Sequence, residues 1–309
     1  MDSRVKAVSR VFPDGTSVQL WPFHVSYEGL ETIIICRDDE DCDAMVKCIF
    51  VCGRKHKVAV IIYAVVSNHA HVAVLAESLE NALAFAQDVK KRYSQLFGRK
   101  YNESKTLRGA DVNVQAIDSV WYLRNALAYV ARNAYDNGAT SLADYKWTGF
   151  GAFFRDRSSL ERGERVSAMT TREWRDLFHT GDNLSDVPWE VNPYGEMLPH
   201  TCCDVEYLEA AFNHDQTFFM NRIGGLNSAE MTQKLVLSPR RMKTDAEFLK
   251  EAEDVSCRWF GKELASLSEQ QKARLLPYMY HTVKTTVPQL SRTFGLKRDH
   301  ISFLLQKGR

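Results

Sequence analysis

Two histidines separated by a single residue are the most chemically suggestive feature of the sequence. His69 and His71 lie in the alternating stretch HAHVAVLAE, which follows the apolar run KVAVIIYAVV and a break at Ser67–Asn68. Side chains at positions i and i+2 of a strand point to the same face, so the two imidazoles converge. Two converging imidazoles can hold one divalent ion and leave its other positions open. The pair therefore predicts a metal site, or, in the plainer interpretation, two histidines on a wet strand face.

The elements around this pair predict an α+β fold. In chain order the sequence pattern first predicts a strand at 17–27, an extended run at 31–36 and a helix from the acidic cluster at 37–43 to residue 53. It then predicts two strands at 57–66 and 69–77, followed by a helix from Ser78. A strand at 110–117 and a helix from 118 to 138 complete the order. This order is close to a ferredoxin-like sandwich, in which one antiparallel sheet carries helices on one side.

Length and composition bound the class of protein. The chain has 309 residues, 45% of them hydrophobic and 26% charged, which predicts about two globular domains and excludes a disordered tail, a collagen-like fibre and a disulfide-stapled miniprotein. No apolar run is long enough for a membrane helix, and no apolar signal-like stretch follows MDSRVKAVSR, so we expect a cytoplasmic protein. The seven cysteines show no CxxC spacing and are interpreted as buried free thiols, while His200 with Cys202 and Cys203 is at most half of a zinc site.

Charge is balanced overall, with 40 basic and 39 acidic residues, but unevenly distributed. The stretch 182–215 contains no Lys or Arg and eight carboxylates. Basic residues gather in two other places. The first place contains Lys90, Lys91, Arg92, Arg99, Lys100, Lys105 and Arg108. The second contains Lys284, Arg292, Lys297, Arg298, Lys307 and Arg309. This distribution predicts a protein that meets a polyanion at two places, or simply solvated helix faces.

Four segments share their spacing with one family of enzymes. They read YAVVSNHAHVAV, HVSYEGLETIIICRDDEDCDAMVKCIF, SLENALAFAQDVKKRYSQLFGRKYN and YLRNALAYVARNAYDNGATSLADYKWTGFGAF. The first resembles the YxVMPNHVHLLV segment of the HUH endonucleases, specifically the single-tyrosine transposases and the REP-associated tyrosine transposases, and the other three resemble the family's flanking segments in the same order. The Met-Pro of the family motif is Val66–Ser67 here. The resemblance covers roughly the first half of the chain.

The resemblance implies a set of reactive residues. The family's nucleophile is a helix-borne tyrosine, matched here by Tyr129, and its Gln or Asn metal ligand four residues later is matched by Asn133. Positions i and i+4 share one helix face, so both side chains can point at a metal held by His69 and His71. Mg²⁺ or Mn²⁺ is the implied ion. The alternatives are that Tyr129 is a core residue, that Asn133 is only a helix C-cap, and that Tyr122, Tyr93 or Tyr135 is the nucleophile.

The C-terminal region carries a second pattern of nucleic-acid recognition. In TVPQLSRTFGLKRDHISFLLQ, two helices flank a turn at Gly295, and the second begins with Lys297, Arg298 and His300. This is a helix-turn-helix pattern, which any small helical pair with a glycine can imitate. It resembles the DnaA-like C-terminal domain of longer REP-associated tyrosine transposases.

These observations predict three regions and one activity. The regions are an HUH single-tyrosine transposase domain at 1–155, an acidic connector at 156–215 and a helical, helix-turn-helix DNA-binding region at 216–309. The predicted DNA contacts are Lys90, Lys91, Arg92, Lys105, Arg108, Lys297, Arg298 and His300. The expected function is a metal-dependent single-stranded DNA endonuclease and transposase that cuts and rejoins DNA near palindromic hairpins through a 5′-phosphotyrosine. The alternative is a catalytically idle, DNA-binding regulator derived from such an enzyme. The expected partners are single-stranded hairpin DNA and, for the C-terminal helices, duplex DNA. We expect the protein at the bacterial nucleoid and not at a membrane. The oligomeric state is left open.

Overall fold

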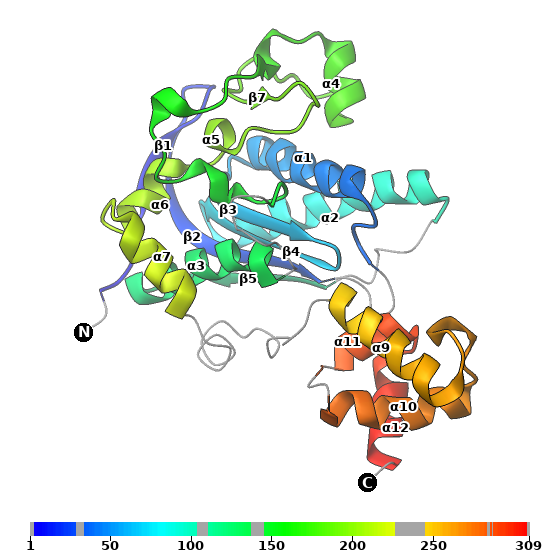
Figure 1. Ribbon diagram of the computed structural model, residues 1–309. Coiled ribbons are helices and arrows are strands. Elements are labelled where there is room, and N and C mark those ends of the chain that lie inside the picture. The colour runs from blue at the N-terminus through cyan, green and yellow to red at the C-terminus, as the bar shows by residue number, and fades with distance from the viewer. Residues whose placement is uncertain are drawn as a thin grey trace.

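A five-stranded antiparallel sheet forms the centre of the protein (Figure 1). The computed structural model describes residues 3–28, 34–103, 111–136, 145–225, 245–282, 285 and 287–307. The strands are β1 (Val8–Val11), β2 (Ser17–Glu28), β3 (Ala59–Val66), β4 (His69–Ala76) and β5 (Asp111–Ala116). They are ordered β5–β2–β4–β3, and β1 pairs with the first part of β2. With α1 (Asp39–His56) after β2 and α2 (Leu79–Tyr101) after β4, this is the ferredoxin-like order, and the predicted α+β class is confirmed. Residues 34–36 of the expected extended run belong to no strand.

The sheet is covered by helices on both faces, not on one as the sequence predicted. Strand alternation sends Phe23 and Val25 into the core beneath α1 and α2, whereas Leu20 joins the second core beneath α3 (Val120–Asp136). The strands present small side chains to α3, among them Ala64 and Ala73, so the helix can approach the sheet closely. This second face carries the histidine pair.

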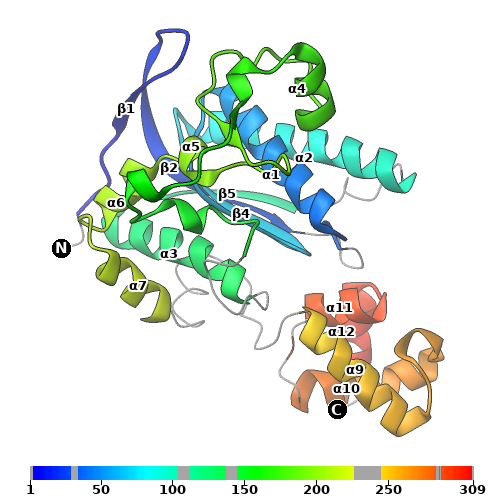
Figure 2. The ribbon, with the colours of Figure 1, turned by 45° about the horizontal axis from the view of Figure 1, so that its top comes forward.

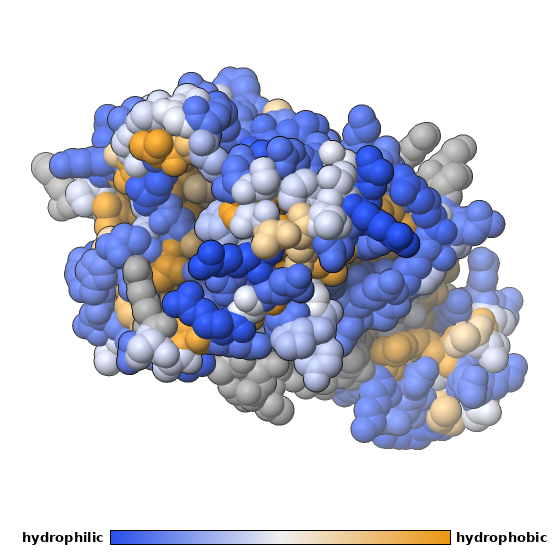
Figure 3. All heavy atoms as spheres, turned by 90° about the horizontal axis from the view of Figure 1, so that it is seen from above, coloured by the Kyte–Doolittle hydropathy of each residue, from blue (hydrophilic) through white to orange (hydrophobic). Residues whose placement is uncertain are grey.

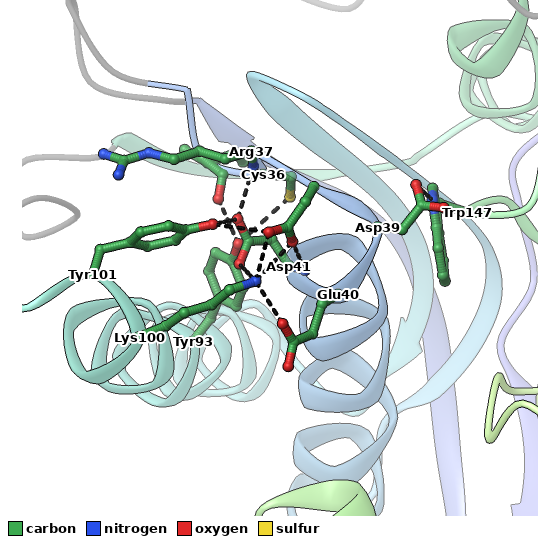
Figure 4. Close-up of polar contacts among 11 residues, drawn as sticks. Cys36, Arg37, Asp39, Glu40, Asp41, Tyr93, Lys100, Tyr101 and Trp147 are labelled. Carbon is green, nitrogen blue, oxygen red and sulfur yellow. Dashed lines mark hydrogen bonds and ion pairs between the residues drawn. The ribbon is translucent and has the colours of Figure 1, made fainter.

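The two helices of the first face are fixed by their ends. The N-cap of α1 is Asp38, whose carboxylate accepts from the backbone N–H of Asp41, and Ser78 caps α2 in the same way, as predicted. Near the C-terminal end of α2, Lys100 forms ion pairs with Asp38, Glu40 and Asp41 at the start of α1 (Figure 4). Lys100 therefore joins the two helices.

The acidic stretch at 156–215 is folded against the sheet. Composition had predicted that this stretch is a connector. It contains β6 (Glu164–Arg165), α4 (Thr171–Phe178), β7 (Glu190–Val191), α5 (Pro199–Cys202) and α6 (Val205–Ala211), and it is followed by α7 (Gln216–Gly225). Trp174 and Phe178 enter the first core, and Phe212 of the stretch enters the second. From above, the surface on this side is mainly hydrophilic with small apolar areas (Figure 3).

The charge pattern of this stretch has a structural explanation. Asp182 pairs with Arg92, Asp186 with Arg54 and Asp204 with Arg10. Carboxylates collected in one segment thus meet cations distributed over the sheet unit. Composition suggested a spacer because it could not show where the opposite charges would lie.

The C-terminal helices form a separate bundle (Figures 1 and 2). It consists of α9 (Asp245–Phe260), α10 (Glu269–Thr282), α11 (Val287–Phe294) and α12 (Arg298–Lys307). Its own core includes Phe248, Leu275, Leu290 and Ile301, and Gly295 adopts φ +66° between α11 and α12.

Short 3₁₀ turns lie at Gly149–Ala152, Arg157–Ser159, Val166–Ala168 and Leu264–Ser266. None of the helices in the described ranges is long and apolar enough to cross a membrane.

Candidate active site

The β3–β4 hairpin and helix α3 bring the four predicted reactive residues together. Tight pairing of β3 with β4 places His69 opposite Val66 and His71 opposite Ala64, with both imidazoles on the face toward α3. Tyr129 and Asn133 lie one turn apart in α3. The convergence of these four residues, which the family resemblance implied, is therefore present in the structure.

Distances within this group are short. The Tyr129 hydroxyl lies 3.4 Å from His71 Nε2, and the rings of these two residues are 5.0 Å apart and nearly perpendicular. Asn133 Oδ1 lies 2.8 Å from His69 Nε2, and the two histidine rings are 5.0 Å apart. His71 and Asn133 are buried, while His69 and Tyr129 keep part of their surface exposed. The site is therefore partly exposed to solvent at Tyr129 and His69.

A third histidine, which residue spacing had not indicated, joins the group. His24 of β2 is buried, its Nε2 lies 3.2 Å from His71 Nδ1, and the two rings are stacked with centroids 5.2 Å apart. Burial lowers the pKa of His24 to about 4, so its imidazole is neutral at neutral pH. Strand alternation could have found it, because His24 shares its face of β2 with Ser26, the residue paired with His71.

The donor set at this point fits a divalent cation. His69 Nδ1 lies 2.7 Å from Asn68 Oδ1, and its Nε2 lies 2.8 Å from Asn133 Oδ1. A neutral imidazole has one N–H donor and one lone pair, so it cannot donate to both amide oxygens. If Nδ1–H donates to Asn68, then Nε2 and Asn133 Oδ1 present two lone pairs that a cation would satisfy. Among the described residues no group of three or more His, Cys, Asp or Glu is placed to hold a metal ion, so the fit depends on the Asn133 amide oxygen beside the two histidines.

The alternative roles of these residues are less compatible with the structure. Tyr122 is buried with its hydroxyl shielded from solvent, and burial raises its pKa. Tyr93 is buried on the opposite face of the sheet, where its hydroxyl donates to the Ile35 carbonyl. The side chain of Tyr135 lies outside the described residues. Asn133 lies inside α3, which continues to Asp136, and its amide oxygen contacts His69, so it is not the C-cap.

The basic residues predicted to contact DNA are not gathered at this site. Lys90, Lys91 and Arg92 belong to α2, which packs on the face of the sheet away from α3, and Arg92 donates to Asp182 at 3.1 Å. Lys105 and Arg108 lie outside the described residues. DNA bound at Tyr129 could reach α2 only by passing around an edge of the sheet.

The remaining predicted contacts lie in the C-terminal bundle. Lys297 and His300 are exposed where α12 begins, and Arg298 is half-buried there. The arrangement of α11, Gly295 and α12 matches the predicted helix-turn-helix order. All seven cysteines are free thiols, as the sequence suggested, but only four of them are buried.

Comparison with known proteins gives only distant likenesses. No protein-family model and no curated protein matches the chain. One similar solved structure is a REP-associated tyrosine transposase bound to a REP hairpin, with 14% identity, a TM-score of 0.34, and coverage of 49% of this chain and 83% of that one. Another is a bacterial tRNA(His) guanylyltransferase-like protein in complex with ATP, with 13% identity, a TM-score of 0.33, and coverage of 62% and 90%. Likenesses at this level carry no inference about activity, which has to be drawn from the side chains of the site.

Proposed function

We propose that this protein is a metal-dependent, single-stranded DNA endonuclease and transposase that cleaves and rejoins DNA near palindromic hairpins through a 5′-phosphotyrosine. The observation that carries the proposal is the convergence of Tyr129, His71, His69 and Asn133 at one partly exposed point. A tyrosine hydroxyl 3.4 Å from a histidine nitrogen, beside a second imidazole and an amide oxygen, unites a nucleophile with ligands for a cation.

Each of the four residues has its own role in the proposed reaction. Tyr129 Oη gives up its proton to solvent and forms a bond to the scissile phosphorus while the bond from phosphorus to the 3′-oxygen breaks. The 3′-oxygen takes up a proton and leaves as a hydroxyl, and the 5′-phosphate stays on the tyrosine. Attack by a free 3′-hydroxyl on this ester reverses the exchange and rejoins a strand. His69, His71 and Asn133 would hold Mg²⁺ or Mn²⁺, which supplies positive charge to offset that of the phosphate and the departing oxygen. Two imidazoles in the donor set favour Mn²⁺ over Mg²⁺.

The direct test is formation of a covalent adduct. The full-length protein is incubated with Mn²⁺ and a panel of single-stranded hairpin oligonucleotides, and the products are separated on a denaturing gel. We expect a band of protein joined to DNA that disappears when EDTA removes the metal. Tight hairpin binding with no adduct at any metal concentration would favour the idle regulator instead.

Replacing Asn133 with Ala should weaken the use of metal without abolishing cleavage. Water can occupy a lost ligand position, so the Mn²⁺ concentration for half-maximal cleavage should rise by roughly 10- to 100-fold, the range seen when support of a metal site is removed. Raised Mn²⁺ should restore part of the rate. An unchanged metal dependence would leave Asn133 with a structural role alone.

The C-terminal bundle is proposed to hold the DNA rather than cut it. Because α7 buries Phe219 against the second core, a shortened chain should end after Gly225 and not at 215. This protein should still form the adduct but bind more weakly. If three side chains of the bundle contact duplex phosphates, the log–log slope of affinity against salt should be shallower by roughly 2 to 3 units than that of the full chain. Identical slopes would show that the bundle does not touch DNA.

A further inference from the structure

The contact between His24 and His71 fixes where the proton of His71 can lie. His24 Nε2 and His71 Nδ1 are 3.2 Å apart, both residues are buried, and the rings are stacked. A hydrogen bond at this contact contains one hydrogen, which belongs either to His71 or to His24. The other ring nitrogen of His71, Nε2, is the one that faces Tyr129.

The two arrangements have opposite consequences for the site. If His71 Nδ1–H donates to His24, then His71 Nε2 keeps its lone pair toward Tyr129 and can bind a cation or accept a hydrogen bond. If His24 Nε2–H donates to His71, then a neutral His71 carries its hydrogen on Nε2 and can do neither. The choice of tautomer by the buried partner therefore decides whether His71 can act at all.

A neighbouring side chain favours the first arrangement. In it, the neutral His24 carries its hydrogen on Nδ1 and needs an acceptor there. Gln115 of β5 is directly opposite His24 in the register of β2 and β5, and alternation along β5 gives it the same face. Its Oε1 is buried, and no described residue donates to it. A buried oxygen without a donor is unfavourable, so a water molecule that links His24 Nδ1–H to Gln115 Oε1 would stabilise this arrangement.

We propose that His24 is a positioning residue, which accepts a hydrogen bond from His71 Nδ1 and so presents the lone pair of His71 Nε2 to the site. The tautomer itself is argued from the packing and does not depend on the function proposed above. Its consequence for metal binding rests on the function proposed above.

The tautomer can be read directly from the metal-free protein by long-range ¹H–¹⁵N spectra of ¹⁵N-histidine-labelled samples, with each signal assigned by a single-histidine variant. We expect His71 to carry its hydrogen on Nδ1. In His24→Leu it should revert to the Nε2–H form that predominates in free imidazole, whereas His24→Asn, whose amide oxygen can accept, should retain the Nδ1–H form. Replacement of the exposed His214 with Gln is the matched control and should change nothing at His71. An Nε2–H tautomer of His71 in the unaltered protein would overturn the proposal.

Titration with Mn²⁺ gives a second readout that does not depend on cleavage. His24→Leu should weaken Mn²⁺ binding by roughly 10- to 100-fold, and His24→Asn by clearly less. Equal affinities for all three proteins would contradict the positioning role. If His24→Leu does not fold, the His71 tautomer in the unaltered protein and the Mn²⁺ affinity of His24→Asn still test the positioning role. A protein with the expected tautomer and no covalent adduct would retain the positioning role while refuting the enzymatic proposal.

Discussion

Replacing Tyr129 with Phe is expected to abolish the covalent protein–DNA adduct completely. The change removes the hydroxyl that is proposed to form the ester with phosphorus. It leaves the ring in place and should lower the free energy of unfolding by no more than about 1.5 kcal/mol, the net value of one hydrogen bond. Adduct formation on denaturing gels and thermal unfolding together check both parts of this expectation.

The matched control for this variant is Tyr122→Phe. Tyr122 lies in the same helix, two turns earlier, but its hydroxyl is buried. This variant should form the adduct at the normal rate. If Tyr129→Phe still forms the adduct and Tyr122→Phe does not, the nucleophile has been assigned to the wrong residue.

His69→Ala and His71→Ala should each abolish cleavage while preserving most of the DNA affinity. In the proposed metal site each change removes one of three protein ligands, so the cation would be lost at ordinary concentrations. The main-chain pairing of β4 does not depend on either side chain. Cleavage is measured with Mn²⁺ present, and binding to hairpin DNA without metal. Cleavage by either variant at the normal rate would refute the metal assignment.

Partly exposed His69 provides the cleaner of the two variants. His71 is buried between His24 and Tyr129, so its loss also leaves a small cavity and a buried His24 nitrogen without its partner. We therefore expect His71→Ala to be the less stable protein. A loss of cleavage in His69→Ala, with unfolding close to that of the original chain, would separate the loss of the metal ligand from any loss of stability.

Local signals in the sequence were sufficient to predict most of the strands and the shared faces of His69 with His71 and of Tyr129 with Asn133. Alternation and the turn at Ser67–Asn68 place His69 and His71 on one face, and helical spacing places Tyr129 above Asn133. These periods depend only on neighbouring residues. The family resemblance then selected Tyr129 among several tyrosines, a choice that spacing alone could not make.

The parts that were missed depend on contacts between distant segments. The acidic stretch looked like a spacer because the partners of its carboxylates, such as Arg10 for Asp204, are as many as 194 positions away in the chain. The face of the sheet that α3 would cover could not be read from its own pattern, because an amphipathic helix fits either face. His24 is 47 positions from His71, and only the pairing of β2 with β4 brings them together.

The most direct test of the central claim is to identify the residue to which DNA becomes attached. The adduct formed with Mn²⁺ and a hairpin oligonucleotide is digested with protease and nuclease, and the remaining nucleotide-bearing peptide is sequenced by mass spectrometry. The proposal predicts a 5′-phosphate ester on Tyr129, in the peptide containing AYVARN. Attachment of the DNA to any other residue would contradict the proposal. So would a strand cleaved in the first turnover whose 5′-phosphate is not attached to the protein.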